Sequence, residues 1–108
     1  MAVYDGSPIK LVAIADKNGS PQQATYFNFT SSQVVKSGPG TLFGIVVNSH
    51  TSGTLKFWDN TAGSGTVIFN TFTFPTGSGV YMLGDGVDFN TGLFATVGGT
   101  IDATLIYS

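Results

Sequence analysis

The chain contains a single histidine, His50, which is the first side chain to consider for acid–base chemistry. It lies in the polar stretch 48–52, beside Ser49, Thr51 and Ser52. A hydrolase needs a nucleophile, a base and an orienting acid brought together, but serine and threonine are common in any polar loop. We therefore interpret His50 as a solvated loop histidine. A zinc site needs three or four ligands, and one histidine without any cysteine does not supply them.

The densest acidic stretch, residues 85–90, contains Asp85, Gly86, Asp88 and Asn90. Oxygen ligands on a glycine-containing loop are typical of calcium sites. The spacing differs from the twelve-residue EF-hand pattern, and the chain has no glutamate for a bidentate contact. Because Asp-Gly is a strong turn signal by itself, the stretch predicts a turn, and we assign no metal ligand.

Paired carboxylates could catalyse glycoside hydrolysis, and Asp59, Asp88 and Asp102 are the candidates for such a pair. Nothing in the spacing marks two of them as partners, and Asp59 and Asp88 stand at predicted strand ends, where turn roles are common. Dinucleotide and phosphate-loop signatures are absent, because Gly98-Gly99 precedes a strand instead of a helix. We therefore predict a protein that is not an enzyme and that has no cofactor.

Trp58 is the chain's one tryptophan. In the alternating run 54–59 it shares the outward face with Lys56, opposite Leu55 and Phe57. An exposed tryptophan can stack on a sugar or anchor a subunit interface. In the alternative interpretation, Trp58 has a structural role and packs beneath a loop or a second layer. Both interpretations stay open, and Trp58 is kept as a candidate partner-binding residue.

Four Gly-Thr pairs stand at the heads of apolar runs and punctuate the chain into short strands. Glycine permits the positive φ of a tight turn, and the β-branched threonine after it suits the first residue of a strand. The pairs are Gly40-Thr41, Gly53-Thr54, Gly65-Thr66 and Gly99-Thr100.

The apolar periodicity between these turns predicts an all-β protein, an antiparallel β-sandwich that is jelly-roll-like and has about eight strands. Residues 9–108 are expected to form this single domain, preceded by an extended N-terminal arm over residues 1–8. A switch of apolar phase near Asn70 predicts a β-bulge. The expected strands span 9–16 (with a short helix as the alternative), 24–30, 33–37, 41–48, 54–59, 66–74, 80–83, 87–89, 93–97 and 100–107.

Composition restricts the class of partner. Among 108 residues only 9% are charged, and neither glutamate nor arginine occurs. Without a basic patch there is nothing to neutralise phosphates or anionic lipids, so we expect neither nucleic acid nor membrane as a partner. No run reaches the roughly 20 apolar residues of a membrane span. A signal peptide is also not seen, and we expect a product made in the host cytoplasm.

Several of these turns and core runs resemble, in the same order, small β-sandwich structural proteins of tailed bacteriophages, some of which are capsid decoration (cement) proteins. The resemblance covers residues 38–108. The segments that carry it are Pro39–Asn48, Gly53–Asn60, Gly65–Ile68, Val87–Leu93 and Ala103–Tyr107.

The resemblance implies a virion protein on the capsid exterior that binds the major capsid protein and forms a homo-oligomer, typically a trimer. Its expected role is to bridge neighbouring capsid subunits. The arm, with Val3, Tyr4 and Ile9, is expected to extend onto a neighbour. Two alternatives stay open: a head-fibre or tail-associated virion module, and a carbohydrate-binding module or adhesin that uses Trp58 and Tyr81 as stacking platforms.

Overall fold

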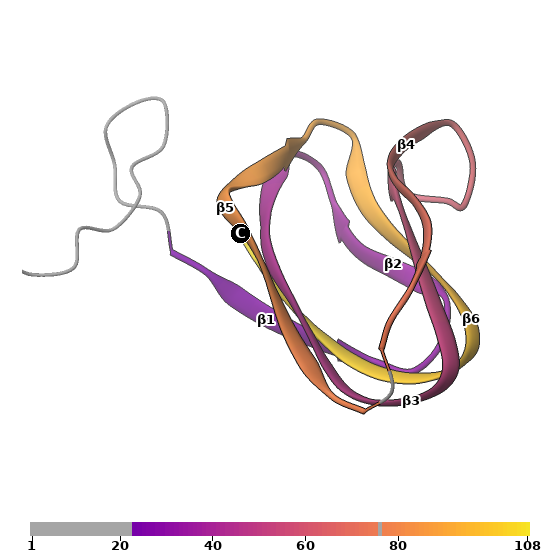
Figure 1. The fold of residues 1–108 in the computed structure, drawn as a ribbon. Coiled ribbons are helices and arrows are strands. Elements are labelled where there is room, and N and C mark those ends of the chain that lie inside the picture. Colours follow the sequence, from indigo (N-terminus) through magenta and orange to yellow (C-terminus); the bar gives the residue numbers. More distant parts are fainter. Residues whose placement is uncertain (1–22, 76) are drawn as a thin grey trace, which may run out of the picture.

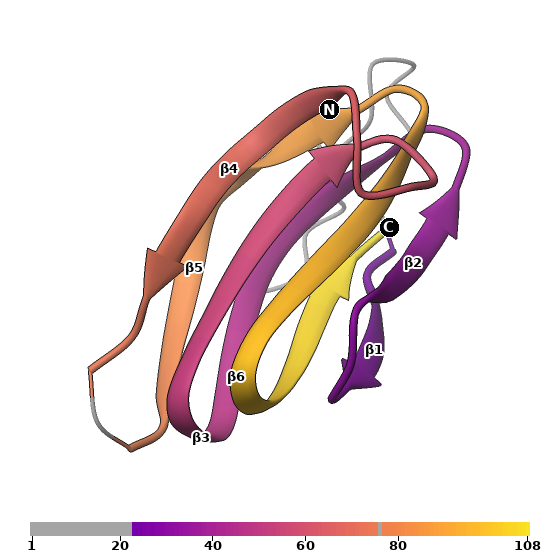
Figure 2. The ribbon, with the colours of Figure 1, turned by 90° about the vertical axis from the view of Figure 1, so that its right-hand side faces the viewer.

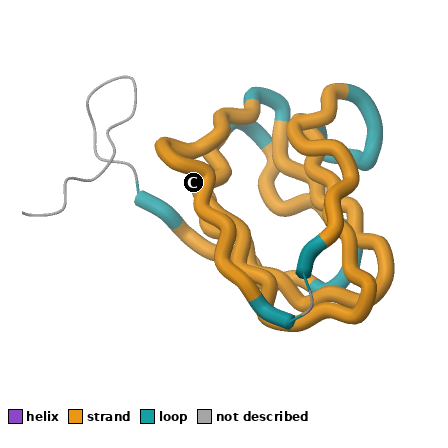
Figure 3. The backbone as a smooth tube through the Cα atoms, in the orientation of Figure 1, coloured by secondary structure: helices purple, strands orange, loops and turns teal. Residues whose placement is uncertain are grey.

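The computed structural model describes residues 23–75 and 77–108. The arm predicted over 1–8 and the element predicted over 9–16 therefore lie outside the described residues. Six strands and no helix make up the described chain, which is all-β (Figure 1, Figure 3). The strands are β1 (Thr25–Phe29), β2 (Gln33–Ser37), β3 (Gly40–Asp59), β4 (Thr66–Thr73), β5 (Gly79–Phe89) and β6 (Gly92–Tyr107).

The two long strands, β3 and β6, form the centre of one antiparallel sheet. They pair with each other over most of their length, from Leu42 opposite Tyr107 to Trp58 opposite Phe94. The shorter strands add to their outer edges. β1 and β2 both pair with β6, and β4 and β5 both pair with β3. β1 and β2 therefore lie at the β6 edge of this central pair, and β4 and β5 lie at its β3 edge.

Each long strand divides its length between two partners. The first part of β3, residues 40–47, pairs with β5, and residues 54–59 pair with β4. In the same way, residues 92–95 of β6 pair with β2, and residues 103–107 pair with β1. Figure 2 shows both long strands turning back on themselves at mid-length, side by side.

Two residues with left-handed backbone conformation mark this bend. Ser52 in β3 has a φ of 51°, and Gly99 in β6 has a φ of 66°. The ladder continues on both sides of the bend, with Thr51 opposite Thr100 and Thr54 opposite Gly98, and with a register shift between these two pairs. The strands therefore bend together and keep their pairing.

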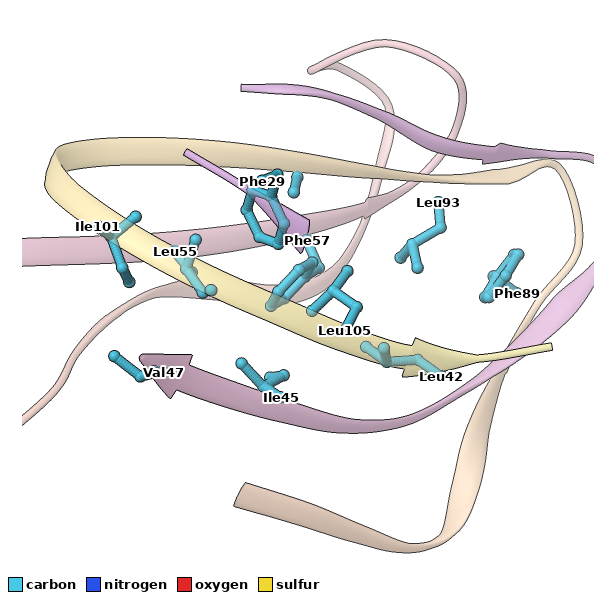
Figure 4. Close-up of a cluster of buried hydrophobic side chains, with 12 residues drawn as sticks. Phe29, Leu42, Ile45, Val47, Leu55, Phe57, Phe89, Leu93, Ile101 and Leu105 are labelled. Carbon is cyan, nitrogen blue, oxygen red and sulfur yellow. The ribbon is translucent and has the colours of Figure 1, made fainter. Parts of the chain in front are cut away.

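The core fills the space that the bent sheet encloses. Leu55 and Phe57 from the second part of β3 are fully buried, as are Ile45 and Val47 from its first part. Burying each such side chain stabilises the fold by about 1.5–3 kcal/mol. Figure 4 shows these side chains pointing toward one another between the strands. The buried cluster comprises Phe29, Leu42, Ile45, Val47, Leu55, Phe57, Phe89, Leu93, Ala95, Ile101, Ala103 and Leu105.

The expectation of about eight separate strands is wrong for the described chain, which has six. Breaks predicted at residues 49–53, 84–86 and 98–99 are irregularities inside continuous strands. In β5, for example, Leu42 pairs with Val87 and Gly44 pairs with Met82, so extra residues of β5 bulge out between the two pairs. Polar and glycine residues signalled a change of direction at these positions. At residues 49–51 the pairing of β3 with β6 continues through the bend, whereas β5 loses its partner after Met82 and resumes pairing with β3 at Val87.

The β-bulge predicted near Asn70 is confirmed. Leu55 pairs with Phe72 and Phe57 pairs with Phe69, so β4 carries one residue more than β3 between these pairs. The switch of apolar phase in the sequence therefore results from the extra residue in β4. The predicted strand 33–37 coincides with β2.

Candidate interaction surfaces

One side of the sheet carries apolar side chains that nothing in the described chain covers. Tyr26 is 73% exposed, Val80 64% and Met82 63%. The register joins them into a patch: Tyr26 pairs with Ile106, Ile106 with Gly44, and Gly44 with Met82. In the next row, Val46 pairs with Val80. We call Tyr26, Val46, Val80, Met82 and Ile106 the outer patch.

Gly44 allows Met82 to lie across the sheet in this patch. A Cβ atom at position 44 would come within 2.8 Å of the Met82 sulfur. The missing side chain therefore leaves the space that the thioether occupies. Met82 stays largely exposed in this position, and flexible methionine side chains adapt well to a binding surface.

A polar cluster borders the outer patch toward the bend. The Nδ2 groups of Asn28 and Asn48 both donate to Asp102 Oδ1, at 2.8 and 3.1 Å, and to Thr104 Oγ1, at 3.0 and 3.2 Å. The side-chain donors of Asn28 and Asn48 hold the pKa of Asp102 below its usual value. The cluster links the neighbouring strands β1, β6 and β3 on this face. The hydrogen-bond partners of Asp102 differ from those of Asp59 and Asp88.

An apolar groove with a volume of about 620 Å³ lies between β4 and β5. Aromatic rings line it in a row, with ring-centroid distances of 6.3 Å between Phe69 and Phe72, 4.8 Å between Phe72 and Phe74, and 5.3 Å between Phe74 and Tyr81. Leu83 and Met82 complete its β5 side. The groove opens between two strands whose other edges both pair with β3.

His50 contacts Phe74 of the groove lining, and its assignment to a solvated loop is wrong. It lies within β3 at the bend, half-buried. Its Nδ1 accepts from the backbone N–H of Gly53 at 3.1 Å, and its Nε2 makes a short hydrogen bond with the carbonyl oxygen of Pro75. The ring also packs edge-on against Phe74. Since both nitrogens have partners, His50 joins the β4–β5 connection to the bend.

Trp58 lies on the opposite face of β3 from Phe57, as predicted, and is half-buried. Its Nε1 donates to Thr96 Oγ1 at 2.9 Å, and the Lys56 ammonium lies 4.2 Å from its ring centroid. Tyr81 instead packs beside Phe74 in the groove. The structure therefore does not bring Trp58 and Tyr81 together into one stacking platform.

Asp59 serves as a cap for the turn between β5 and β6. Its carboxylate accepts from the backbone N–H groups of Asn90 at 3.0 Å, Thr91 at 2.7 Å and Gly92 at 3.3 Å. Burial works to raise the pKa of Asp59, but these three donors together outweigh it and hold the pKa below its usual value of 3.8. This arrangement agrees with the turn role that the sequence suggested.

Asp59→Ala is expected to lower the free energy of unfolding by about 1–2 kcal/mol at neutral pH, since it leaves three backbone donors without their acceptor. A carboxyl group whose pKa is lowered by folding stabilises above its unfolded-state pKa of 3.8, and this contribution disappears as pH falls through the folded-state pKa. Urea unfolding near pH 7 and near pH 2 should therefore show a gap between wild type and variant that narrows in acid.

The exposed Asp85 provides the matched control for this prediction. Asp85→Ala is expected to change stability by less than about 0.5 kcal/mol. A loss for Asp59→Ala no larger than that of the control would contradict the capping role.

The predicted turn at Asp85-Gly86 is wrong, because both residues lie in β5. Gly86 has a φ of 99° and forms part of the bulge, where a Cβ atom would press on the side chains of Thr41 and Phe43. Asp88 accepts a hydrogen bond from Thr41 Oγ1 at 2.8 Å. Within residues 23–75 and 77–108, no group of three or more histidine, cysteine or acidic side chains is close enough to hold a metal ion.

Of the four predicted partner-binding residues, Val3, Tyr4 and Ile9 lie outside the described residues, and Trp58 is described above. The outer patch was not predicted. A signal for it was present in residues 80–83, where apolar residues occupy both faces of a strand. Such a run is typical of a strand covered on both sides, and here the described residues leave one side uncovered.

Searches of family models, curated proteins and solved structures found no match for this chain. The part of the chain that the structure describes contains no helix of the length and hydrophobicity that a membrane crossing requires.

Proposed function

We propose that this chain is a structural virion protein that decorates a phage capsid and stabilises it by bridging neighbouring capsid subunits. The observation that carries the proposal is the outer patch, where Tyr26, Val80 and Met82 are each more than 60% exposed. Contiguous exposed apolar side chains on a sheet face mark protein interaction sites in soluble proteins. Binding through such a face to the assembled shell, and not to free subunits, stabilises the shell by mass action.

The strand order supports a jelly-roll-like sandwich as the architecture of this protein. When β3 and β6 are each divided at the bend, eight segments result. One layer then reads β1, the second part of β6, the first part of β3, β5, and the other reads β2, the first part of β6, the second part of β3, β4. Two four-stranded layers joined in this way are what a jelly roll requires.

The resemblance to phage structural proteins supports the virion assignment, since its segments fall on strands of the described chain and on the turns between them. Pro39–Asn48 and Gly53–Asn60 form most of β3, and Ala103–Tyr107 lies in the second part of β6. These segments supply both the buried core and the outward-facing Val46 and Ile106 of the outer patch. The proposed role involves no catalytic step.

The protein content of purified virions tests this proposal. Particles of the phage that encodes the chain, purified on a density gradient, are expected to contain the protein in a copy number comparable with that of the major capsid protein. Quantitative mass spectrometry measures this ratio. A few copies per particle would favour the head-fibre or tail-associated module instead, and absence from the particles would overturn the virion assignment.

Binding of the protein to isolated capsid shells tests whether the outer patch is the surface that contacts the capsid. Met82→Asp on the outer patch is expected to reduce binding to expanded, undecorated shells at least tenfold, because it places a charge in an apolar contact. Asp85→Asn, also on β5 but outside the patch, is the control and should bind as the wild type does. Equal binding of both variants would exclude the outer patch as the capsid contact.

A further inference from the structure

β5 has an edge that no strand of the described chain covers. Its other edge pairs with β3, and the stretch from Gly79 to Met82 pairs residue by residue with the stretch from Val47 to Gly44. Such a regular strand presents an ordered row of unpaired N–H and C=O groups that can accept another strand. The facing strand β4 is a poorer acceptor, because two register shifts interrupt it.

Both faces beside this edge are apolar. Tyr81 and Leu83 point to the groove side, where they pack against the buried cluster. Val80 and Met82 lie on the outer patch and are 64% and 63% exposed. A strand added here would place alternate side chains into the groove and onto the outer patch. Its occupant must therefore be apolar at successive positions and not only at every second one.

The sequence preceding the described residues contains a run with this pattern, Ile9-Lys10-Leu11-Val12-Ala13-Ile14. We propose that this run, from a second copy of the chain, adds to the free edge of β5 as a strand. Its single charge sets the orientation: Lys10 faces solvent together with Val12 and Ile14, beside the outer patch. Ile9, Leu11 and Ala13 then enter the groove against Phe72 and Phe74.

The placement of β1 favours a second copy as the donor of the run. β1 begins at Thr25 and lies on the edge of β6, whereas β5 lies on the far edge of β3. The described chain thus enters the sheet, at Thr25, at the edge opposite to that of β5. When donor and acceptor edges lie on opposite sides of a subunit, each copy donates to the next in a head-to-tail contact, and such contacts form rings or open filaments according to the rotation between copies.

Cross-linking of introduced cysteines tests the site, and the chain suits this experiment because it has no cysteine of its own. Full-length Val12→Cys chains are mixed with full-length Val80→Cys chains and treated with a short bismaleimide. A covalent dimer is expected on a denaturing gel. In the matched control, Val34→Cys chains take the place of Val80→Cys chains. Val34 is also exposed, but it lies on β2, which pairs with β6 and not with β3.

Each outcome of this experiment decides the proposal. A dimer with Val80→Cys and none with Val34→Cys supports it. Equal yields with both, or no product with either, overturn it. An intramolecular product in the Val12→Cys/Val80→Cys double variant, without dimer in the mixture, would overturn the assignment to a second copy.

The solution mass provides a second, independent measurement. Light scattering on a sizing column is expected to give a multiple of 11.2 kDa for the wild type and the monomer mass for Leu11→Asp, because the charge would enter the apolar groove. Lys10→Asp, on the solvent side of the same run, should keep the oligomer. A monomeric wild type, or equal masses for both variants, would overturn the proposal. Because these measurements use the chain alone, they remain decisive even if the protein is absent from virions.

Discussion

Phe57→Ala is expected to lower the free energy of unfolding by about 3–5 kcal/mol, the range typical of a buried phenylalanine truncated to alanine. Phe57 is completely buried, and its ring contacts those of Phe69 and Phe72 at centroid distances of 6.4 and 6.2 Å. It lies where the second part of β3 meets β4. The loss combines the transfer of apolar surface with an unfilled cavity, since the surrounding strands relax only partly.

Chemical denaturation followed by fluorescence or circular dichroism measures this loss. Since a domain of this size is stable by only about 5–15 kcal/mol, the variant is expected to be close to unfolding. Tyr26→Ala is the matched control, because it removes another aromatic ring that is 73% exposed, and its effect should stay within about 0.5 kcal/mol. Similar losses for the two variants would contradict the position of the core.

Gly99→Ala is expected to destabilise the protein by about 2–4 kcal/mol, which is more than left-handed backbone strain alone costs at an unhindered position. Gly99 has a φ of 66° at the bend of β6. A Cβ atom there would overlap the carbonyl oxygen of Ser52, and the backbone of Gly53 lies beyond it. Backbone atoms in a paired strand cannot move aside as a flexible side chain can, so the two long strands would have to separate at the bend.

Gly84→Ala isolates the contribution of this close approach. Gly84 has nearly the same backbone conformation, with a φ of 60°, but a Cβ atom at this position would meet nothing within 4 Å. Its substitution is therefore expected to cost only the backbone strain, about 1 kcal/mol. Thermal and urea unfolding of both variants give the comparison, and equal losses would show that β3 and β6 do not approach closely at Gly99.

The Gly-Thr pairs show which strand boundaries of this fold can be predicted from the sequence. Gly40-Thr41 and Gly65-Thr66 mark the beginnings of β3 and β4, as predicted. Gly53-Thr54 and Gly99-Thr100 carry the same local signal but lie at the bend, inside β3 and β6. A glycine followed by a β-branched residue reports a change of direction. Whether the strand ends there depends on whether a neighbouring strand bends at the same place.

The interaction surfaces divide in a similar way. The outward position of Trp58 followed from alternation, because side chains of a strand alternate between faces wherever it lies. The sequence also suggested a turn role for Asp59, because this residue stands at a strand end. The outer patch and the groove could not be predicted, since both depend on β5 pairing with β3 while the other edge of β5 stays uncovered by any described strand.

The amino-acid sequence by itself determined the all-β class, the faces that are buried, the β-bulge in β4 and most strand positions, because these depend on side-chain periodicity and on the local backbone preferences of glycine and β-branched residues. Only the tertiary structure decided that β3 and β6 are continuous and that His50 joins the bend to the β4–β5 connection. It also decided that the apolar side chains of Tyr26, Val80 and Met82 gather on one face, which the described residues leave exposed. These features arise from pairing between segments far apart in the chain, and the periodicity of a single strand carries no information about which strand lies beside it.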